Sequence, residues 1–253
     1  MNNAPIGLFD SGLGGLTVLR ALWRRLPTES FIYLADTARF PYGPQPASTI
    51  QRYALENARF LVDRGVKLLV VPCHTASVCA LDLLRQEFSI PVIGMVEASL
   101  LSLQKFSTPK RIALLATAGT LTSNVYQNLI QLSAPHIELF PLACPELVTL
   151  AEGYAQGDFP SDAEEIVRRT LAALPSVDAY LLGCTHFPLL NHFMSSLLLI
   201  DPAEQCAQQV EEQLIATNQL NSLTSPVLEM HTTCNRKELL AIARKVVAQK
   251  ALP

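Results

Sequence analysis

Two short segments of the chain resemble each other, and each places a cysteine at the end of an apolar run. Residues 68–75 read LLVVPCHT, and residues 179–186 read AYLLGCTH. In both, a run with strand character stops at a proline or glycine, and a cysteine follows, Cys73 in the first and Cys184 in the second. Thiols repeated in equivalent places indicate chemistry in which two like groups act on one substrate from two sides.

The surroundings of both cysteines suit acid–base work. A thiol acts as a base or nucleophile only as the thiolate, so its reference pKa of about 8.5 has to be lowered by neighbours. A helix that begins directly after the strand lowers it, and a nearby histidine lowers it further. Cys73 precedes His74, and Cys184 precedes His186 and Pro188, a residue that suits the first turn of a helix.

Other uses of these thiols explain the sequence less well. Zinc sites usually carry ligand pairs such as C-x₂-C on one rigid element, and each segment offers one isolated thiol. A cysteine hydrolase needs a single thiol, which leaves the duplication unexplained. A redox pair usually has C-x-x-C spacing. The remaining cysteines show no repeated context and are predicted to be small apolar residues in or near the core: Cys79, Cys144, Cys206 and Cys234.

A glycine-rich loop, DSGLGG at residues 10–15, follows an apolar strand and opens a helix. Its glycines allow a ligand close to the backbone, and a helix N-terminus offers N–H groups to an anion. The spacing is not that of the dinucleotide fingerprint. Asp10 would repel a phosphate, but it could pair with a substrate ammonium group or orient a base. It could equally be the N-cap of the helix, and the residues leave both readings open.

Further polar groups fall at the ends of the expected strands. Tyr42 and Gly43 lie in a proline-containing loop and could add a hydroxyl and a backbone N–H to a cleft. Hydroxyls suited to binding carboxylates follow strands in both halves of the chain: Thr75, Thr117, Thr120 and Thr185.

Strands alternate with helices along the chain. The pattern predicts strands at 6–9, 31–34 and 68–72, with helices at 13–26 and 50–64 between them. This alternation is typical of an α/β fold, in which a mostly parallel sheet is covered by helices on both faces. Ligands bind such sheets at the carboxyl ends of the strands, where the cysteines fall.

The same pattern then starts again about 110 residues later, which is the size of a domain. Residues 111–120 resemble the opening strand and loop, 137–140 resemble 31–34, and the pair 164–174 and 179–182 resembles the helix and strand before Cys73. We therefore expect two similar α/β domains, 1–96 plus 208–253 and 97–207, with the active site in the cleft between them. The segment after about residue 207 (a strand at 227–230 and a helix at 237–249) is expected to complete the first domain.

Composition bounds the class of protein. Of 253 residues, 49% are hydrophobic and 16% charged, which is typical of a folded globular chain, and the net charge of −3 argues against nucleic acid or an anionic membrane as partner. The sequence contains no apolar run long enough for a membrane span and no N-terminal signal pattern, so a cytoplasmic protein is expected. A homodimer is compatible with the sequence, which carries no signal that sets the oligomeric state.

Five motifs together resemble one family. They are FDSGLGGLTV (9–18), ADTARFPYG (35–43), CHTAS (73–77), PVIG (91–94) and LGCTHFPLL (182–190). In this order they resemble the glutamate racemases of the aspartate/glutamate racemase family, which are cofactor-independent enzymes of the bacterial cell-wall pathway. The motifs span most of the chain and are jointly specific. The resemblance implies racemisation of L-glutamate to D-glutamate for peptidoglycan synthesis, with no metal, no pyridoxal phosphate and glutamate as the small-molecule partner.

The resemblance also implies roles for individual residues. Cys73 and Cys184 would exchange the Cα proton, with Asp10 assisting one thiol and Glu152 and His186 the other. Substrate contacts are implied for Asp10, Ser11, Tyr42, Gly43, His74, Thr75, Thr185 and His186, and Thr117 and Thr120 are added from their strand-end positions.

One position departs from the family pattern: His74 stands where the family has an asparagine whose amide both donates and accepts. A histidine titrates near pH 6.5. As a cation it could hold a thiolate or a substrate carboxylate, and as a larger side chain it could lower activity or change the substrate. Two other functions are compatible with the sequence: a racemase or epimerase of another amino acid, such as aspartate or diaminopimelate, and a non-catalytic two-domain amino-acid-binding protein.

Overall fold

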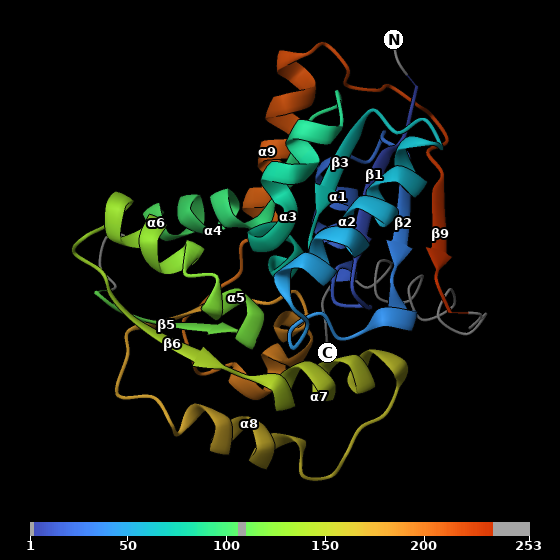
Figure 1. Ribbon diagram of the computed structural model, residues 1–253. Helices are drawn as coiled ribbons and strands as arrows, with labels where there is room; N and C mark the ends of the chain where they lie inside the picture. Colours follow the sequence, from blue (N-terminus) through green and yellow to red (C-terminus); the bar gives the residue numbers. More distant parts are fainter. Residues whose placement is uncertain (1–2, 106–109, 235–253) are drawn as a thin grey trace.

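The computed structural model describes residues 3–105 and 110–234, and these form two parallel sheets with helices packed on them (Figure 1). Within these residues the first sheet has five strands in the order β4-β3-β1-β2-β9, and the second has four in the order β6-β5-β7-β8. The first sheet comprises β1 (Ile6–Asp10), β2 (Phe31–Ala35), β3 (Leu68–Val71), β4 (Val92–Gly94) and β9 (Leu228–Thr232). The second comprises β5 (Arg111–Ala116), β6 (Glu138–Ala143), β7 (Ala179–Gly183) and β8 (Leu199–Ile200).

The strands that the sequence repeat equates occupy equivalent places. Taken from its opposite edge, the second sheet has the order β8-β7-β5-β6. This order repeats β4-β3-β1-β2 of the first sheet when β5, β6, β7 and β8 are matched with β1, β2, β3 and β4. Every pair of neighbouring strands is parallel in both sheets. The expected fold class, two similar parallel sheets flanked by helices, is confirmed.

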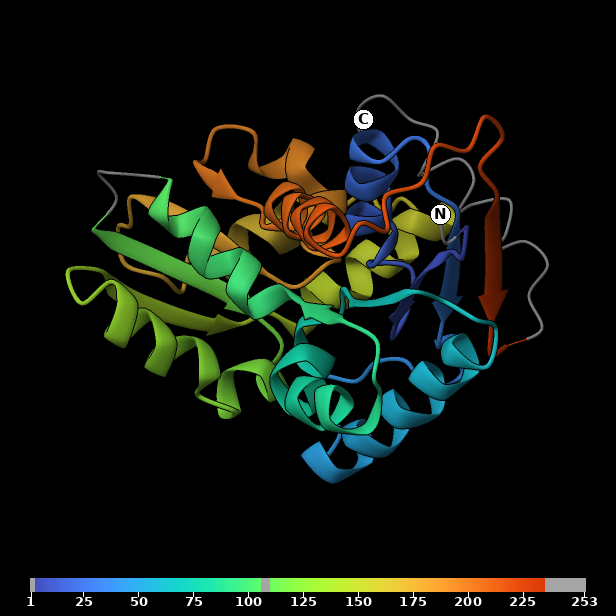
Figure 2. The same cartoon turned by 90° about the horizontal axis from the view of Figure 1, so that it is seen from above.

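Helices cover both faces of each sheet. They are α1 (Leu16–Arg25), α2 (Ala47–Val62), α3 (His74–Glu87), α4 (Met95–Gln104), α5 (Ala118–Thr122), α6 (Val125–Ser133), α7 (Pro145–Gln156), α8 (Ala163–Leu171) and α9 (Ala203–Ala216), with 3₁₀ helices η1 (Thr37–Arg39) and η2 (Phe187–Met194). In Figure 1, α4 and α6 lie on one side of the second sheet and α7 and α8 on the other. Seen from above, α9 runs beside α4 and α1, with which it packs (Figure 2).

Alternation along the strands explains the layers. On β3, Leu68 and Val70 enter one core with α1, whereas Leu69 and Val71 enter another with α2 and α3. Successive side chains of a strand point to opposite faces, so a strand covered on both sides is apolar throughout. The core that contains α1 continues into α7 and α8 of the second half, so the two halves share one apolar interior.

The C-terminal strand β9 pairs in parallel with β2 and forms an edge of the first sheet, on the right in Figure 1. The boundaries proposed for the two domains remain a prediction, and the helix expected at 237–249 lies outside the described residues. The first expected helix begins later than predicted, at Leu16, because the glycine-rich loop occupies residues 11–15. No helix among the described residues is both long and apolar enough to cross a membrane.

Candidate active site

The carboxyl ends of strands from both sheets meet around one narrow cavity. Within it lie ten of the residues singled out in the sequence: Ser11, Tyr42, Gly43, Cys73, His74, Thr75, Thr117, Cys184, Thr185 and His186. Three further predicted residues lie behind this wall and are buried: Asp10, Thr120 and Glu152. The cavity has a volume of about 10 Å³, which is room for about one water molecule.

Cys73 follows β3 and caps the N-terminus of α3. Its sulfur accepts the backbone N–H of Ala76 at 3.5 Å, and its thiol donates to Ser11 Oγ at 3.9 Å. Burial raises the pKa of Cys73 above its ordinary value, and the nearby charge of Asp10 raises it further, whereas the Ala76 N–H lowers it. The net shift is upward, so the thiol carries its proton in the state that the structure describes.

Cys184 follows β7 and has a different partner. Its sulfur lies 3.6 Å from Nδ1 of His186, whose Nε2 lies 2.8 Å from Oε2 of Glu152. The same carboxylate oxygen accepts the backbone N–H of Leu13 at 3.0 Å, so Glu152, on α7, ties the glycine-rich loop of the first half to the second. All three side chains of this relay are buried.

The two charged members of the relay stabilise each other. Burial alone would lower the pKa of His186, but its hydrogen bonds to Cys184 and Glu152 outweigh burial and hold the pKa well above 6.5. Burial raises the pKa of Glu152, yet the hydrogen bond and charge of His186 lower it on balance. The pair is therefore an imidazolium and a carboxylate, and a positive charge stands beside the sulfur of Cys184.

Asp10 links the loop to the second half. One carboxylate oxygen accepts the backbone N–H of Gly12 at 3.0 Å, and the other accepts the hydroxyl of Thr185 at 3.1 Å. Burial raises its pKa, although the charge of His186 opposes this. Asp10 makes no side-chain bond to the N-terminus of α1, so the N-cap reading is wrong. It supports the loop that carries Ser11.

The hydroxyl of Tyr42 does not provide the free group expected at the cleft. It hydrogen-bonds to the carboxylate of Asp36 and lies 3.0 Å from the amide nitrogen of Asn57. A buried carboxylate needs donors, and Asp36 is fully buried. Gly43 instead joins the halves through its backbone, since its carbonyl accepts the N–H of Gly119 at 2.9 Å.

Three threonine hydroxyls form a buried triangle across the two halves. Thr75 lies 2.8 Å from Thr117 and 3.2 Å from Thr120, and the last two lie 3.0 Å apart. Thr75 and Thr117 line the cavity, and Thr120 supports them from behind.

His74 lies in the cavity wall and is neutral. Burial lowers its pKa to about 3, so the cationic role considered for this residue is not supported. Its Nδ1 lies 2.6 Å from the hydroxyl of Tyr126, with the rings stacked at 5.9 Å between centroids.

Sequence reasoning missed several supporting residues. Asp36 directly follows β2 and Asp10 ends the neighbouring strand β1, and that parallel could have identified Asp36. No spacing signal marks Asn57 or Tyr126, because each reaches the site from a helix distant in sequence. Phe40, Pro41 and Val148 complete the cavity wall with apolar surface.

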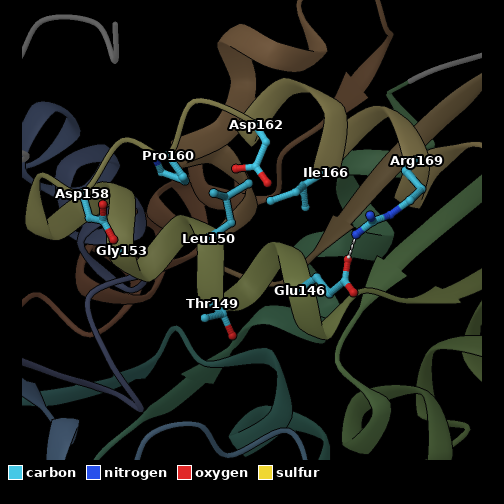
Figure 3. A pocket seen from close by; sticks show the side chains of 9 residues that line it. All are labelled: Glu146, Thr149, Leu150, Gly153, Asp158, Pro160, Asp162, Ile166 and Arg169. Carbon is cyan, nitrogen blue, oxygen red and sulfur yellow. Dashed lines mark hydrogen bonds and ion pairs between the residues drawn. The ribbon is translucent and has the colours of Figure 1, made fainter.

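A larger groove lies elsewhere, between α7 and α8, with a volume of about 460 Å³ (Figure 3). Its lining includes the exposed ion pair of Arg169 and Glu146, 2.8 Å apart, and the carboxylates of Asp158 and Asp162, and it contains none of the predicted site residues. Among the described residues, no group of three or more histidine, cysteine or acidic side chains is placed to hold a metal ion.

Comparison with known proteins assigns the chain to a family. The model of the family described as Asp/Glu/Hydantoin racemase matches residues 13–210. The chain belongs to the Asp/Glu/Hydantoin racemase family. The glutamate racemase of Levilactobacillus brevis is 38% identical over 100% of this chain and 94% of its own length.

Solved structures of the family share the fold. The crystal structure of a glutamate racemase isoform from Bacillus anthracis aligns with a TM-score of 0.91 at 30% identity, covering 99% of this chain and 96% of that one. The glutamate racemase of Francisella tularensis subsp. tularensis SCHU S4, in complex with D-glutamate, aligns with a TM-score of 0.88 at 30% identity, with the same coverage of both chains. The prediction of an isomerase of the racemase type is confirmed.

Proposed function

We propose that this racemase interconverts L-glutamate and D-glutamate by proton transfer at Cα between two thiols, Cys73 and Cys184. The observation that carries the proposal is that both sulfurs reach the same cavity from the equivalent strands β3 and β7. Both thiols are buried, so their proton affinities are set by fixed protein neighbours rather than by water.

We infer a starting state from the neighbours of the two thiols. Cys73 carries its proton, because burial and Asp10 raise its pKa. Cys184 lies 3.6 Å from Nδ1 of His186, and we take it as the thiol that starts as the base. For one enantiomer, the Cys184 thiolate takes the Cα proton and Cys73 delivers its own proton to the opposite face of the carbanion. The reaction leaves Cys184 as thiol and Cys73 as thiolate, which is the state that serves the other enantiomer.

Removing a proton from a carbon beside a carboxylate requires stabilisation of the developing charge and exclusion of water. We assign that stabilisation to hydroxyls and backbone N–H groups around the cavity, including those of Ser11, Thr75, Thr117 and Thr185, together with the backbone at Gly43. Asp10, Glu152 and His186 set the charge around the thiols. The scheme uses no cofactor and no metal.

Glutamate is the proposed substrate because the full-length relative and both structural relatives are glutamate racemases, and one of these structures holds D-glutamate. We further propose that the enzyme acts in the cytoplasm and supplies D-glutamate for peptidoglycan. Assembly into a homodimer remains a prediction.

Turnover in deuterated water tests the two-base step. Starting from L-glutamate, the D-glutamate formed should carry deuterium at Cα, while unreacted L-glutamate recovered at low conversion should keep its protium. Deuterium entering substrate and product at equal initial rates would indicate a single base. A panel that includes aspartate and diaminopimelate separates glutamate from the alternative substrates.

Removal of each thiol tests the assignment of residues. Cys73→Ala and Cys184→Ala should each abolish racemisation. Cys79→Ala is the matched control, since Cys79 lies on α3 and is half-buried away from the cavity. Full activity in either site variant removes that thiol from the mechanism.

A further inference from the structure

A buried hydrogen-bonded chain runs from the cavity wall into the second half of the molecule. Nδ1 of His74 lies 2.6 Å from the hydroxyl of Tyr126, on α6, and that hydroxyl lies 3.1 Å from Oγ of Ser99, on α4. Ser99 in turn donates to the carbonyl of Met95 at 2.7 Å. His74, Tyr126 and Ser99 are all buried, so protein groups rather than water satisfy this chain.

The direction of donation follows from the far end. Oγ of Ser99 lies 2.7 Å from the carbonyl of Met95 and 3.1 Å from the hydroxyl of Tyr126, so the single proton of Ser99 is assigned to the shorter contact, with Met95. The contact between Tyr126 and Ser99 then needs the tyrosine proton. The contact between His74 and Tyr126 is then left to the Nδ1–H of His74. The neighbours thus select the Nδ1–H tautomer of the imidazole.

This tautomer leaves a lone pair on Nε2 of His74. No described residue makes a hydrogen bond to that nitrogen. It is nevertheless not a sealed, unsatisfied atom, so it borders open space. Because His74 is 3% exposed and lines the cavity, the space that Nε2 reaches is the cavity. The low pKa of His74, about 3, keeps the ring neutral at physiological pH. The wall therefore presents a fixed hydrogen-bond acceptor.

We propose that His74 is a specificity-determining residue whose Nε2 accepts a hydrogen bond from the ammonium group of the substrate, with Tyr126 and Ser99 as the positioning residues that hold its tautomer. This inference rests on the proposed function for the identity of the substrate. A carboxylate offers no proton to Nε2, whereas an ammonium offers three. An asparagine amide could turn either its donor or its acceptor to the ligand. In the Nδ1–H tautomer, Nε2 of His74 can only accept a hydrogen bond from the ligand.

Ser99→Ala tests the tautomer in the ligand-free protein. Without Ser99, the Tyr126 proton has no acceptor on α4 and turns to Nδ1, so His74 should switch to the Nε2–H form. Ser102→Ala is the matched control, since Ser102 lies on the same helix, is buried and makes the same bond four residues back, to Ala98 at 2.8 Å. It should leave the tautomer unchanged.

The readout is the pair of ring ¹⁵N chemical shifts in protein labelled at its five histidines, with the His74 signals identified by their loss in His74→Asn. Tyr126→Phe gives a second route if Ser99→Ala does not fold, since it removes the bond to Nδ1 and should leave both tautomers populated. A wild-type His74 in the Nε2–H form, or a Ser99→Ala protein that keeps the Nδ1–H form, overturns the proposal.

Ligand affinity tests the role of the acceptor. A hydrogen bond to a charged group is lost in Ser99→Ala, so D-glutamate should bind about tenfold more weakly by calorimetry, with KM rising and kcat changing less. Binding of 2-hydroxyglutarate, whose hydroxyl both donates and accepts, should change less than twofold. Equal losses for both ligands contradict ammonium recognition. Failure of racemisation with the tautomer and binding results intact would instead contradict the proposed function.

Discussion

The Glu152→Gln variant tests the asymmetry of the two thiols most directly. Glutamine keeps the length of the side chain, and its carbonyl oxygen can still accept from His186 and Leu13, which now share Oε2 of the carboxylate. What disappears is the negative charge that lies 2.8 Å from Nε2 of His186. The pKa of His186, held well above 6.5 by Cys184 and Glu152, should fall.

The size of the effect follows from the hydrogen bond. A bond to a charged group stabilises by about 1.5–3 kcal/mol and a neutral one by about 0.5–1.5 kcal/mol, so the exchange removes about 1–1.5 kcal/mol from the stabilisation of the His186 imidazolium beside Cys184. At about 1.4 kcal/mol per factor of ten, kcat/KM should drop about tenfold at neutral pH. The two side chains are only 2% and 8% exposed, so solvent screens little of this.

The pH profile carries the sharper signature. The imidazolium of His186 is lost as pH rises through its pKa, and the lowered pKa in Glu152→Gln moves that loss to lower pH. The loss of kcat/KM in Glu152→Gln, relative to the wild type, should therefore grow as pH rises between about 6 and 9. Measurements of kcat/KM in both directions, by circular dichroism, contain an internal check: the enantiomers have equal free energy, so the two values must fall together.

Glu146→Gln is the matched control. Glu146 lies on the same helix, is 60% exposed and pairs with Arg169 at the surface, where an ion pair stabilises by about 1 kcal/mol at most. It should leave kcat/KM and the pH profile unchanged. An unaltered alkaline limb in Glu152→Gln would show that Glu152 acts by packing alone, and equal losses in both variants would trace the effect to helix α7.

Three further outcomes follow from the structure. A Cβ at Gly119 would lie 2.7 Å from the Gly43 carbonyl oxygen, so Gly119→Ala should force the halves apart and lower kcat/KM at least tenfold, whereas Gly153→Ala, with no neighbour closer than 3.7 Å, should not. Lys67→Met breaks a 2.7 Å ion pair with Glu29 in which both side chains are 0% exposed, and urea unfolding should show a loss of about 3–5 kcal/mol with the activity of the folded fraction unchanged. Because the pKa of Glu152 is lowered from 4.5, its stabilisation is present above that pH and is lost as pH falls through its folded-state pKa, and acid titration of Glu152→Gln should lack this component.

The architecture could be predicted well from the sequence because the strands and helices of both sheets show local sequence patterns. Strands such as β3 are apolar at every position, helices begin at glycine or proline signals, and the repeat predicts equivalent strand ends. The thiols Cys73 and Cys184 follow from that reasoning alone. Glu152 came only from the family resemblance, because no spacing rule connects it with a histidine 34 residues away.

What the sequence could not show is which polar groups satisfy one another. The Tyr42 hydroxyl was expected at the cleft, but the buried Asp36 attracts it. His74 was expected to be a possible cation, but its partner Tyr126 arrives from a helix 52 residues away and burial keeps the ring neutral. Side-chain pairing at the meeting of two halves depends on their relative placement, which local patterns do not encode.

The duplication itself explains why the site is not symmetric. A racemase handles two mirror-image ligands with equal free energies, yet every group around them is built from L-residues, so equivalent surroundings for the two thiols are not available. The repeat supplies two strand ends, and the neighbours then differ: Ser11 and a helix N-terminus beside Cys73, an imidazolium beside Cys184. Thermodynamics requires equal kcat/KM in both directions, but not equal thiols. In the mechanism proposed above, the difference in neighbours sets which thiol holds the proton between turnovers, and hence which enantiomer the resting enzyme is ready to receive.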